Sequence, residues 1–148
     1  MFMSPARALG VLTALLAVSS QVGVSAAPTG DIPANAIEAR ASKTFTGDAT
    51  FYAPGLGSCG KTNNGGQLVA AVAAPVFDKF PGAGPNPNKN PICGKKARVT
   101  FKNKSVTVSL VDRCPGCGNS GIDLSPAAFE KLASKSVGRL KGVKWTIL

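Results

Sequence analysis

The sequence feature that most constrains the fold is a strand–turn–strand pattern over residues 99–110. Apolar side chains occupy every second position on both sides of a short polar segment: Val99, Phe101, Val106, Val108 and Leu110. A period of two is typical of β-strands that bury one face, and Asn103-Lys104 is the turn that we expect to join the two strands. The pattern therefore predicts a β-hairpin, the clearest element of the chain.

Other patterns add further strands and one helix. Residues 45–52 are rich in β-forming side chains, and in residues 143–147 apolar and polar side chains alternate strictly, so both segments are predicted strands. Residues 68–74 form an apolar run of strand length, although their alanines are also compatible with a helix. A helix is predicted over 126–135, where Ser125 can cap its first turn. Because a small domain made mostly of strands avoids exposed edges by closing on itself, we expect a barrel with one short helix.

The N-terminal residues are interpreted as targeting and lead-in segments. Residues 1–26 contain an apolar run over 9–18 and end in small residues, the pattern of a signal peptide. The run is too short for a membrane anchor, since a membrane span takes about 20 residues. Residues 27–42 show no period and are taken as a propeptide or flexible lead-in, which leaves 43–148 as one secreted, extracellular domain.

Charge and the lack of histidine restrict the chemistry open to this chain. It carries 17 Lys+Arg against 7 Asp+Glu, a net charge of +10, and no histidine. The missing histidine excludes Ser-His-Asp hydrolases, Cys-His proteases and histidine-ligated zinc. A basic secreted domain favours polyanionic partners, such as an acidic wall polysaccharide or an anionic protein. We expect a monomer that binds no membrane, and no nucleic acid, because no basic patch is interleaved with aromatic residues.

Four cysteines in an exported chain predict disulfide bonds. The segment from Cys114 to Cys117 has Pro and Gly at the centre of a type II turn, which brings its ends within about 7 Å and allows the two cysteines to bond. Cys59 then pairs with Cys93 by subtraction, which closes a long loop that is too proline-rich over 77–92 for regular structure. The alternatives are a thioredoxin-like redox pair, which requires a βαβ pattern not seen here, and a four-cysteine zinc site, which requires two close pairs.

Two carboxylates stand at positions suited to chemistry. Asp112 ends the second hairpin strand and Asp123 precedes the helix, so both are expected on loop faces, where scaffolds display functional groups. If the two converge, one gains a raised pKa and can act as a general acid. The structural alternatives are a turn cap or a pair with Arg113 for Asp112, and favourable helix-terminus electrostatics for Asp123. Trp145 is interpreted as a core residue rather than a sugar platform.

Four segments in a fixed order carry a family resemblance: GDATFY over 47–52, VDRCPGC over 111–117, IDLSPAAF over 122–129, and the terminal Lys144-Trp145. Together they resemble the RlpA-like double-psi β-barrel group, which includes the first domain of expansins, fungal loosenin-like proteins, barwin-like proteins and a bacterial papain inhibitor. The resemblance covers the domain from about residue 45 to its end. It implies a single six-stranded double-psi β-barrel with one or two short helices, two disulfides and a surface groove.

The resemblance also implies the residues of that groove. In microbial expansins the groove holds a Thr of the first strand and two Asp residues, which match Thr50, Asp112 and Asp123 here. The Asp that matches Asp123 is the one on which those proteins depend for wall loosening. Cys114 stands where those proteins have a groove Tyr, and Tyr52 is the candidate to compensate. We therefore assign Asp123 and Asp112 as catalytic candidates, and these two with Thr50 and Tyr52 as the substrate-binding groove.

Three functions are consistent with these residues. The first is binding and loosening of cell-wall polysaccharide without net hydrolysis. The second is a secreted protein-binding effector, such as an inhibitor of papain-type cysteine proteases, with the loops over 54–66 and 78–92 as binding edges. The third is weak hydrolysis or lytic cleavage of a polysaccharide. No cofactor and no metal are expected, and Asn103 opens a candidate glycosylation sequon at the hairpin tip.

Overall fold

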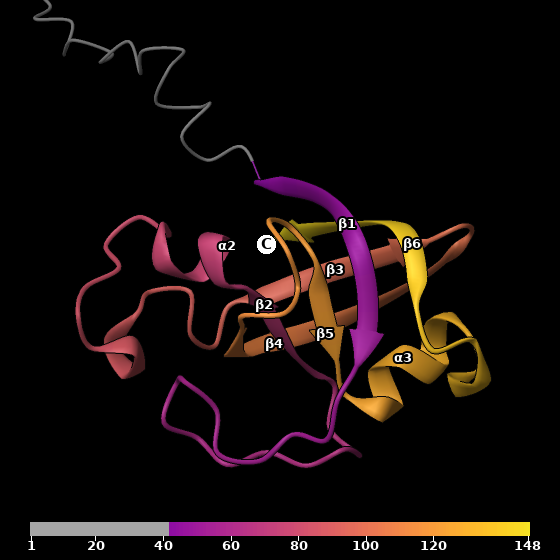
Figure 1. Cartoon of the computed structure of the whole chain (residues 1–148), viewed down its shortest axis with the longest axis horizontal. Coiled ribbons are helices and arrows are strands. Elements are labelled where there is room, and N and C mark those ends of the chain that lie inside the picture. Colours follow the sequence, from indigo (N-terminus) through magenta and orange to yellow (C-terminus); the bar gives the residue numbers. More distant parts are fainter. Residues whose placement is uncertain (1–41) are drawn as a thin grey trace, which may run out of the picture. The chain divides into compact units, whose positions relative to one another are not determined.

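Six strands form the domain in the computed structural model, which describes residues 42–148; the predicted signal peptide and the lead-in up to residue 41 lie outside the described residues. The strands are β1 (Thr44–Phe51), β2 (Val69–Ala73), β3 (Lys96–Phe101), β4 (Lys104–Cys114), β5 (Ile122–Leu124) and β6 (Leu140–Ile147). They close into a barrel in the order β1-β5-β2-β4-β3-β6 (Figure 1). The pairs β1–β5 and β2–β4 are parallel and the other four are antiparallel, so the expected six-stranded barrel is confirmed.

The interior of the barrel is the hydrophobic core. Val99, Val108 and Leu110, which alternate along the hairpin strands, are all buried. Trp145 is fully buried, stacks on Phe45 with 4.3 Å between ring centroids, and donates its indole N–H to the carbonyl of Ser120 at 2.8 Å. The prediction that Trp145 belongs to the core is confirmed, and its polar atom is satisfied as a buried indole requires.

The hairpin forms as predicted, with its turn shifted by one residue. Phe101 pairs with Lys104 at the end of the β3–β4 ladder, so the turn residues are Lys102 and Asn103 rather than Asn103 and Lys104. Lys102 takes up the left-handed conformation that such tight turns need, with φ 53°. Asn103 is exposed at the tip, and its glycosylation stays a prediction.

Helix α3 (Pro126–Leu132) matches the predicted helix at its start and is shorter at its end. The hydroxyl oxygen of Ser125 accepts the N–H of Ala128 at 3.3 Å, which confirms Ser125 as the cap. The helix ends before Ala133, whose backbone is extended with φ −160°. In Figure 1, α3 follows β5 and lies against the barrel, where it contacts β4.

Short helical turns interrupt the segment that was expected to be irregular. Helix α2 (Ala74–Asp78) begins directly after β2, and a 3-10 turn, η1 (Pro87–Lys89), follows in the long loop. A second 3-10 turn, η2 (Lys135–Val137), lies between α3 and β6. The prediction of no regular structure over 77–92 was therefore wrong at 77–78 and at 87–89. Both helical segments have a proline in their first turn, where no N–H is needed. No helix within residues 42–148 is long and apolar enough to cross a membrane.

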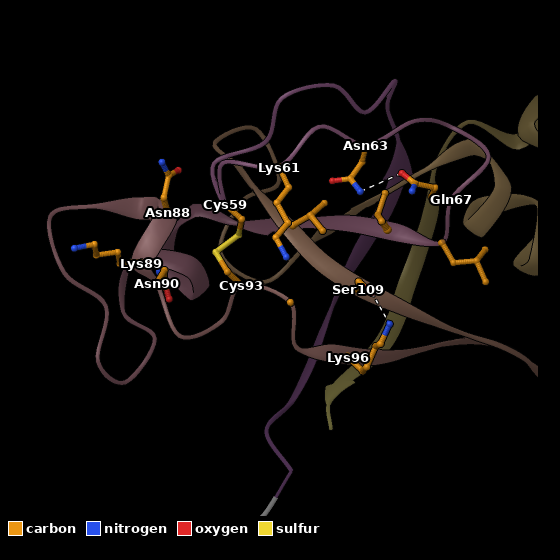
Figure 2. A pocket seen from close by; sticks show the side chains of 14 residues that line it. Cys59, Lys61, Asn63, Gln67, Asn88, Lys89, Asn90, Cys93, Lys96 and Ser109 are labelled. Atoms are coloured by element: carbon orange, nitrogen blue, oxygen red, sulfur yellow. Dashed lines mark hydrogen bonds between the residues drawn. A yellow bond between two sulfur atoms is a disulfide. The ribbon is translucent and has the colours of Figure 1, made fainter.

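Both predicted disulfides are present, and no cysteine is free in the described chain. The Cys59–Cys93 bond joins the loop after β1 to the loop before β3 (Figure 2). The Cys114–Cys117 bond closes the predicted turn, but that turn is not of type II, which would require a positive φ at Gly116. The positive φ falls at Gly118 instead, at 62°. The bonded sulfurs do not match the zinc alternative, which requires four thiolates.

Candidate functional site

Four residues on neighbouring strands lie level with one another across the wall of the barrel. Thr50 of β1 pairs with Asp123 of β5, Asp123 pairs with Ala71 of β2, and Ala71 pairs with Asp112 of β4. Residues that are level in neighbouring strands point their side chains to the same face of the sheet. We call these four residues the carboxylate row. The row brings together Thr50, Asp112 and Asp123, the three residues that the expansin resemblance assigned to a groove.

A β-bulge in β4 puts Asp112 into this row. Ala70 pairs with Leu110 but Ala71 pairs with Asp112, so Val111 is an extra residue in β4. Without it, the side chain of Asp112 would face the opposite side of the wall, because side chains alternate along a strand. The carbonyl of Val111 accepts the N–H of Cys59 at 3.2 Å, which ties the loop after β1 to the bulge.

Asp112 is held by hydrogen bonds to a single carboxylate oxygen. Its Oδ1 accepts the backbone N–H of Ser58 at 2.8 Å, the Ser58 hydroxyl at 2.9 Å and the backbone N–H of Arg113 at 2.8 Å. Ser58 could not be predicted as a partner, because it lies 54 residues from Asp112 and no local pattern connects the two. The alternative prediction, an ion pair between the side chains of Asp112 and Arg113, is wrong. The Arg113 guanidinium instead donates two hydrogen bonds, of 2.8 and 2.7 Å, to the carboxylate of Asp78.

Asp123 is the half-buried carboxylate of the row. The hydroxyl of Thr50 donates a hydrogen bond of 2.8 Å to its Oδ1. Burial raises the pKa of Asp123 above its ordinary value; the Thr50 hydrogen bond and the Arg139 charge oppose this rise, and the Asp112 charge adds to it. A carboxyl with a raised pKa keeps its proton to higher pH and can donate it, which is the property expected of a general acid. The cap of the following helix is Ser125 rather than Asp123.

Tyr52 lies beside both carboxylates. It follows the last residue of β1, and its N–H donates to the carbonyl of Leu124 at 3.0 Å, which continues the β1–β5 pairing by one residue. Partial burial raises the pKa of its phenol well above the ordinary value, and the charges of Asp112 and Asp123 act in the same direction. The Tyr52 hydroxyl therefore stays protonated and can donate a hydrogen bond to a ligand near the row.

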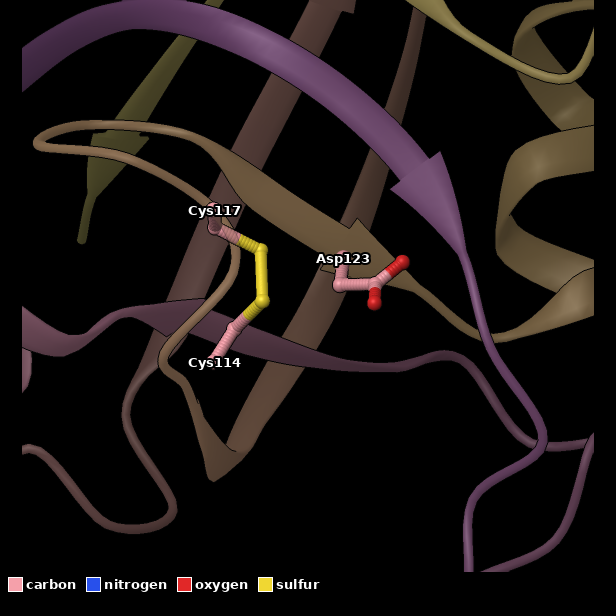
Figure 3. Close-up of side chains that lie close together, drawn as sticks. All are labelled: Cys114, Cys117 and Asp123. Carbon is pink, nitrogen blue, oxygen red and sulfur yellow. A yellow bond between two sulfur atoms is a disulfide. The ribbon is translucent and has the colours of Figure 1, made fainter.

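The Cys114–Cys117 disulfide forms a wall beside Asp123. The two sulfurs and a carboxylate oxygen of Asp123 lie within 4.8 Å of one another, and Figure 3 shows the carboxylate next to the sulfur–sulfur bond. Because the sulfurs are bonded to each other, this group offers one carboxylate rather than three metal ligands. Cys114, which stands where microbial expansins have a groove Tyr, thus contributes an apolar sulfur surface to the site.

Two cavities of about 350 Å³ each lie near the carboxylate row, and neither is lined by Asp112 or Asp123. One is lined by Thr50, Cys117 and Arg139 at the Asp123 end. The other is lined by Ser58, which binds Asp112, by Arg113, which follows Asp112 in the chain, and by Asp78.

The barrel topology and the carboxylate row define a double-psi β-barrel protein of the RlpA-like class. The family model described as lytic transglycolase matches residues 44–145, and the chain belongs to that family.

Three proteins illustrate how the chain relates to others. It is 36% identical to an allergen Asp f 7 homolog of Arthroderma benhamiae, in an alignment of 71% of this chain that spans only 39% of that protein. It is 33% identical to the papain inhibitor of Streptomyces mobaraensis over 89% of this chain and 87% of the inhibitor. The structure of the Streptomyces papain inhibitor matches with a TM-score of 0.65, 34% identity and coverage of 72% of this chain and 94% of the inhibitor. An apo expansin of Clavibacter michiganensis matches with a TM-score of 0.58 and 25% identity, over 72% of this chain and 50% of the expansin.

Proposed function

We propose that this protein is secreted and that the carboxylate row binds a cell-wall polysaccharide and loosens it without net hydrolysis. The observation that carries the proposal is the placement of Asp112 and Asp123 on either side of a single alanine, with Thr50 bonded to Asp123. Asp112 and Asp123 point to the same face of the barrel wall, so one glycan segment can contact both. Secretion is supported by the two disulfides, which persist in oxidising compartments.

The two carboxylates take different roles in this proposal. Asp112 is fixed through Oδ1 by Ser58 and the Arg113 N–H, so its Oδ2 is the atom that accepts a hydrogen bond from a glycan hydroxyl. Asp123, whose pKa is raised by burial, donates a proton or a hydrogen bond to a glycan oxygen. That donation competes with the hydrogen bonds that hold neighbouring polysaccharide chains together, and the polymer weakens although no glycosidic bond breaks.

The test measures mechanical weakening and product release in the same sample. Protein produced from the full-length chain is added to cellulose filter strips and to isolated plant wall under constant load, and soluble sugars and new reducing ends are assayed. We expect extension without sugar release for the native protein, and loss of extension for Asp123→Asn. Glu130→Gln is the matched control, because it also removes one carboxylate, from an exposed ion pair with Lys135. Unchanged extension with Asp123→Asn would contradict the proposal.

Cleavage of the polymer is the enzymatic alternative, and the description of the matching family as lytic transglycolase supports including it. Asp112 and Asp123 supply the two carboxyl groups that many glycosidases use as acid and base. Release of oligosaccharides from glucan, chitin or peptidoglycan that disappears with Asp123→Asn would replace loosening by cleavage as the function of the row.

Inhibition of a cysteine protease is the second candidate, and the high coverage of the Streptomyces papain inhibitor supports it. The Cys59–Cys93 bond links the two predicted binding edges, 54–66 and 78–92, and so limits their freedom before binding. The test is inhibition of papain and related proteases by the native protein and by Asp123→Asn. Equal inhibition by both would assign that activity to the loops, independently of the carboxylate row, and no inhibition across the panel would remove this candidate.

A further inference from the structure

A third cavity, of about 760 Å³, opens on the outer face of the barrel, and none of the residues of the carboxylate row lines it (Figure 2). Its floor comes from β2 and β4, with Val69, Ser109 and Val111 among the lining residues. The Cys59–Cys93 disulfide also lines it and joins the two loops between which the cavity opens. The loop after β1 separates the two sites, since Ser58 binds Asp112 whereas its neighbour Cys59 faces the cavity.

The lining of this cavity is basic and rich in amides. Lys61, Lys89 and Lys96 contribute to it, and none of the 14 described residues that line it is acidic or aromatic. Figure 2 shows Lys61 reaching in from the loop after β1, while Lys96 donates a hydrogen bond of 2.6 Å to Ser109. Lys61 and Lys96 have no acidic partner in the lining and create a local positive potential, which favours an anionic ligand, whereas the Lys89 side chain extends away from them in Figure 2.

One amide of the lining has an unused acceptor. Asn63 donates through Nδ2 to the Oε1 of Gln67 at 3.1 Å, and that oxygen is itself fixed by the N–H of Asn64 at 3.0 Å. This arrangement fixes the orientation of the Asn63 amide, because the reverse orientation would place two oxygens against each other. The Asn63 Oδ1 is then buried without a partner in the described structure. Because this oxygen has no surface open to solvent, a ligand reaches the exposed amides of Gln67 and Asn88 instead.

We propose that this cavity binds a carboxylated polysaccharide, a chain of uronic acid units. The carboxylates of such a chain pair with Lys61 and Lys96, and its ring hydroxyls exchange hydrogen bonds with Gln67 and Asn88. A neutral glycan fits less well, since no aromatic face is present for a sugar ring to stack on. An acidic peptide brings charge without the regular hydroxyls that the amides require. The net charge of +10 also favours approach to an anionic polymer.

The proposal is tested with a homogeneous oligogalacturonate, its carboxyl-reduced neutral form, and an oligoglutamate of the same charge. Binding to protein produced from the full-length chain is measured by calorimetry at low and physiological salt. The double variant Lys61→Gln/Lys96→Gln is compared with Lys131→Gln/Lys144→Gln, which removes the same charge from exposed lysines that line neither this cavity nor those beside the carboxylate row. Both variants are checked for an unchanged thermal unfolding temperature.

We expect oligogalacturonate affinity to fall about tenfold in the cavity variant and to change less than about twofold in the control variant. The neutral oligomer should bind weakly to all proteins. An equal loss of oligogalacturonate affinity in both double variants would mean that net charge alone causes the binding, and this would overturn the proposal. Tighter binding of oligoglutamate or equal binding of the neutral oligomer would also overturn it. Failure of wall loosening alone would leave this site unaffected, because the two sites share no tested residue.

Discussion

Asp112 and Asp123 lie level with each other on the two strands that flank β2, because one extra residue in β4 brings Asp112 opposite the same alanine that Asp123 faces. The two carboxylates differ in their surroundings. The oxygen of Asp112 is bonded to Ser58 and a backbone N–H, whereas burial and a single Thr50 hydroxyl act on Asp123. Such a pair of unlike acids is the arrangement by which a protein assigns a proton donor and an acceptor at the same pH.

The raised pKa of Asp123 predicts how stability depends on pH. The folded protein binds this proton more tightly than the unfolded chain, whose Asp pKa is about 3.9, so stability contributed here is lost as pH rises through the folded pKa. Asp123→Asn removes that loss. We expect the variant to be more stable than the native protein at pH 7 by less than about 1 kcal/mol, because solvent screens a half-exposed carboxyl, and the difference to shrink toward pH 3.

Urea unfolding of both proteins at pH 3, 5 and 7 measures this difference. Thr50→Val is a second variant, in which Asp123 keeps its carboxyl but loses the Thr50 hydrogen bond. Because that hydrogen bond lowers the pKa of Asp123, its loss should raise this pKa further, which a carboxyl titration by NMR would record. A difference between native protein and Asp123→Asn that grows toward acid pH would contradict the sign of the argument.

The same pKa predicts an acid-favoured activity. If Asp123 acts as a proton or hydrogen-bond donor, wall extension should be full while its carboxyl is protonated and should decline as pH rises through its raised pKa. Thr50→Val should move that decline to higher pH. Extension rates of wall strips between pH 3.5 and pH 8, which spans the transition on any upward shift from about 3.9, provide the measurement. A rate that increases with pH over this range would show that the ionised form of Asp123 is the active one.

The loop that carries Ser58 depends on a close approach at Gly57. A Cβ at Gly57 would lie 2.5 Å from the carbonyl oxygen of Val111 and 3.3 Å from the side chain of Asp112, whereas a Cβ at Gly55 meets nothing within 4 Å. Gly57→Ala should therefore push the loop away from the bulge, weaken the Ser58–Asp112 bonds and destabilise the fold by about 1–3 kcal/mol. Gly55→Ala is the matched control and should change stability by less than about 1 kcal/mol.

Chemical unfolding gives the stability change, and wall extension gives the effect on the row. Loss of extension in Gly57→Ala at a temperature where the variant is fully folded would support the positioning of Asp112 by this loop. Equal stability of the two alanine variants would contradict the close contact.

Features that depend on local sequence could be predicted, and features that depend on distant contacts could not. The hairpin, the Ser125 cap and the Cys114–Cys117 bond follow from spacing within a few residues. The bulge at Val111 and the contact of Ser58 with Asp112 depend on strands and loops that meet only after folding, so no run of neighbouring residues reveals them.

One error came from a local feature. Pro87 was counted as evidence against regular structure over 77–92, although it lies in the first turn of η1, where proline is favoured. The resemblance identified Thr50, Asp112 and Asp123, and the register places them in one row. It gave no indication of the amide-rich cavity, whose lining residues come from both long loops and three strands.

The two disulfides should contribute unequally to stability. The Cys59–Cys93 bond spans 34 positions and the Cys114–Cys117 bond spans 3, and the entropy that a crosslink removes from the unfolded chain grows with loop length. Replacing Cys59 and Cys93 together by alanine should cost about 4 kcal/mol, and the same change at Cys114 and Cys117 about 2 kcal/mol. The second variant, however, alters the wall beside Asp123 and should reduce wall extension more than its stability loss explains. Urea unfolding and extension assays on both variants check these expectations. A larger stability loss for the variant without the Cys114–Cys117 bond would contradict the dependence on loop length. Unchanged wall extension in that variant would contradict a role of this disulfide beside Asp123.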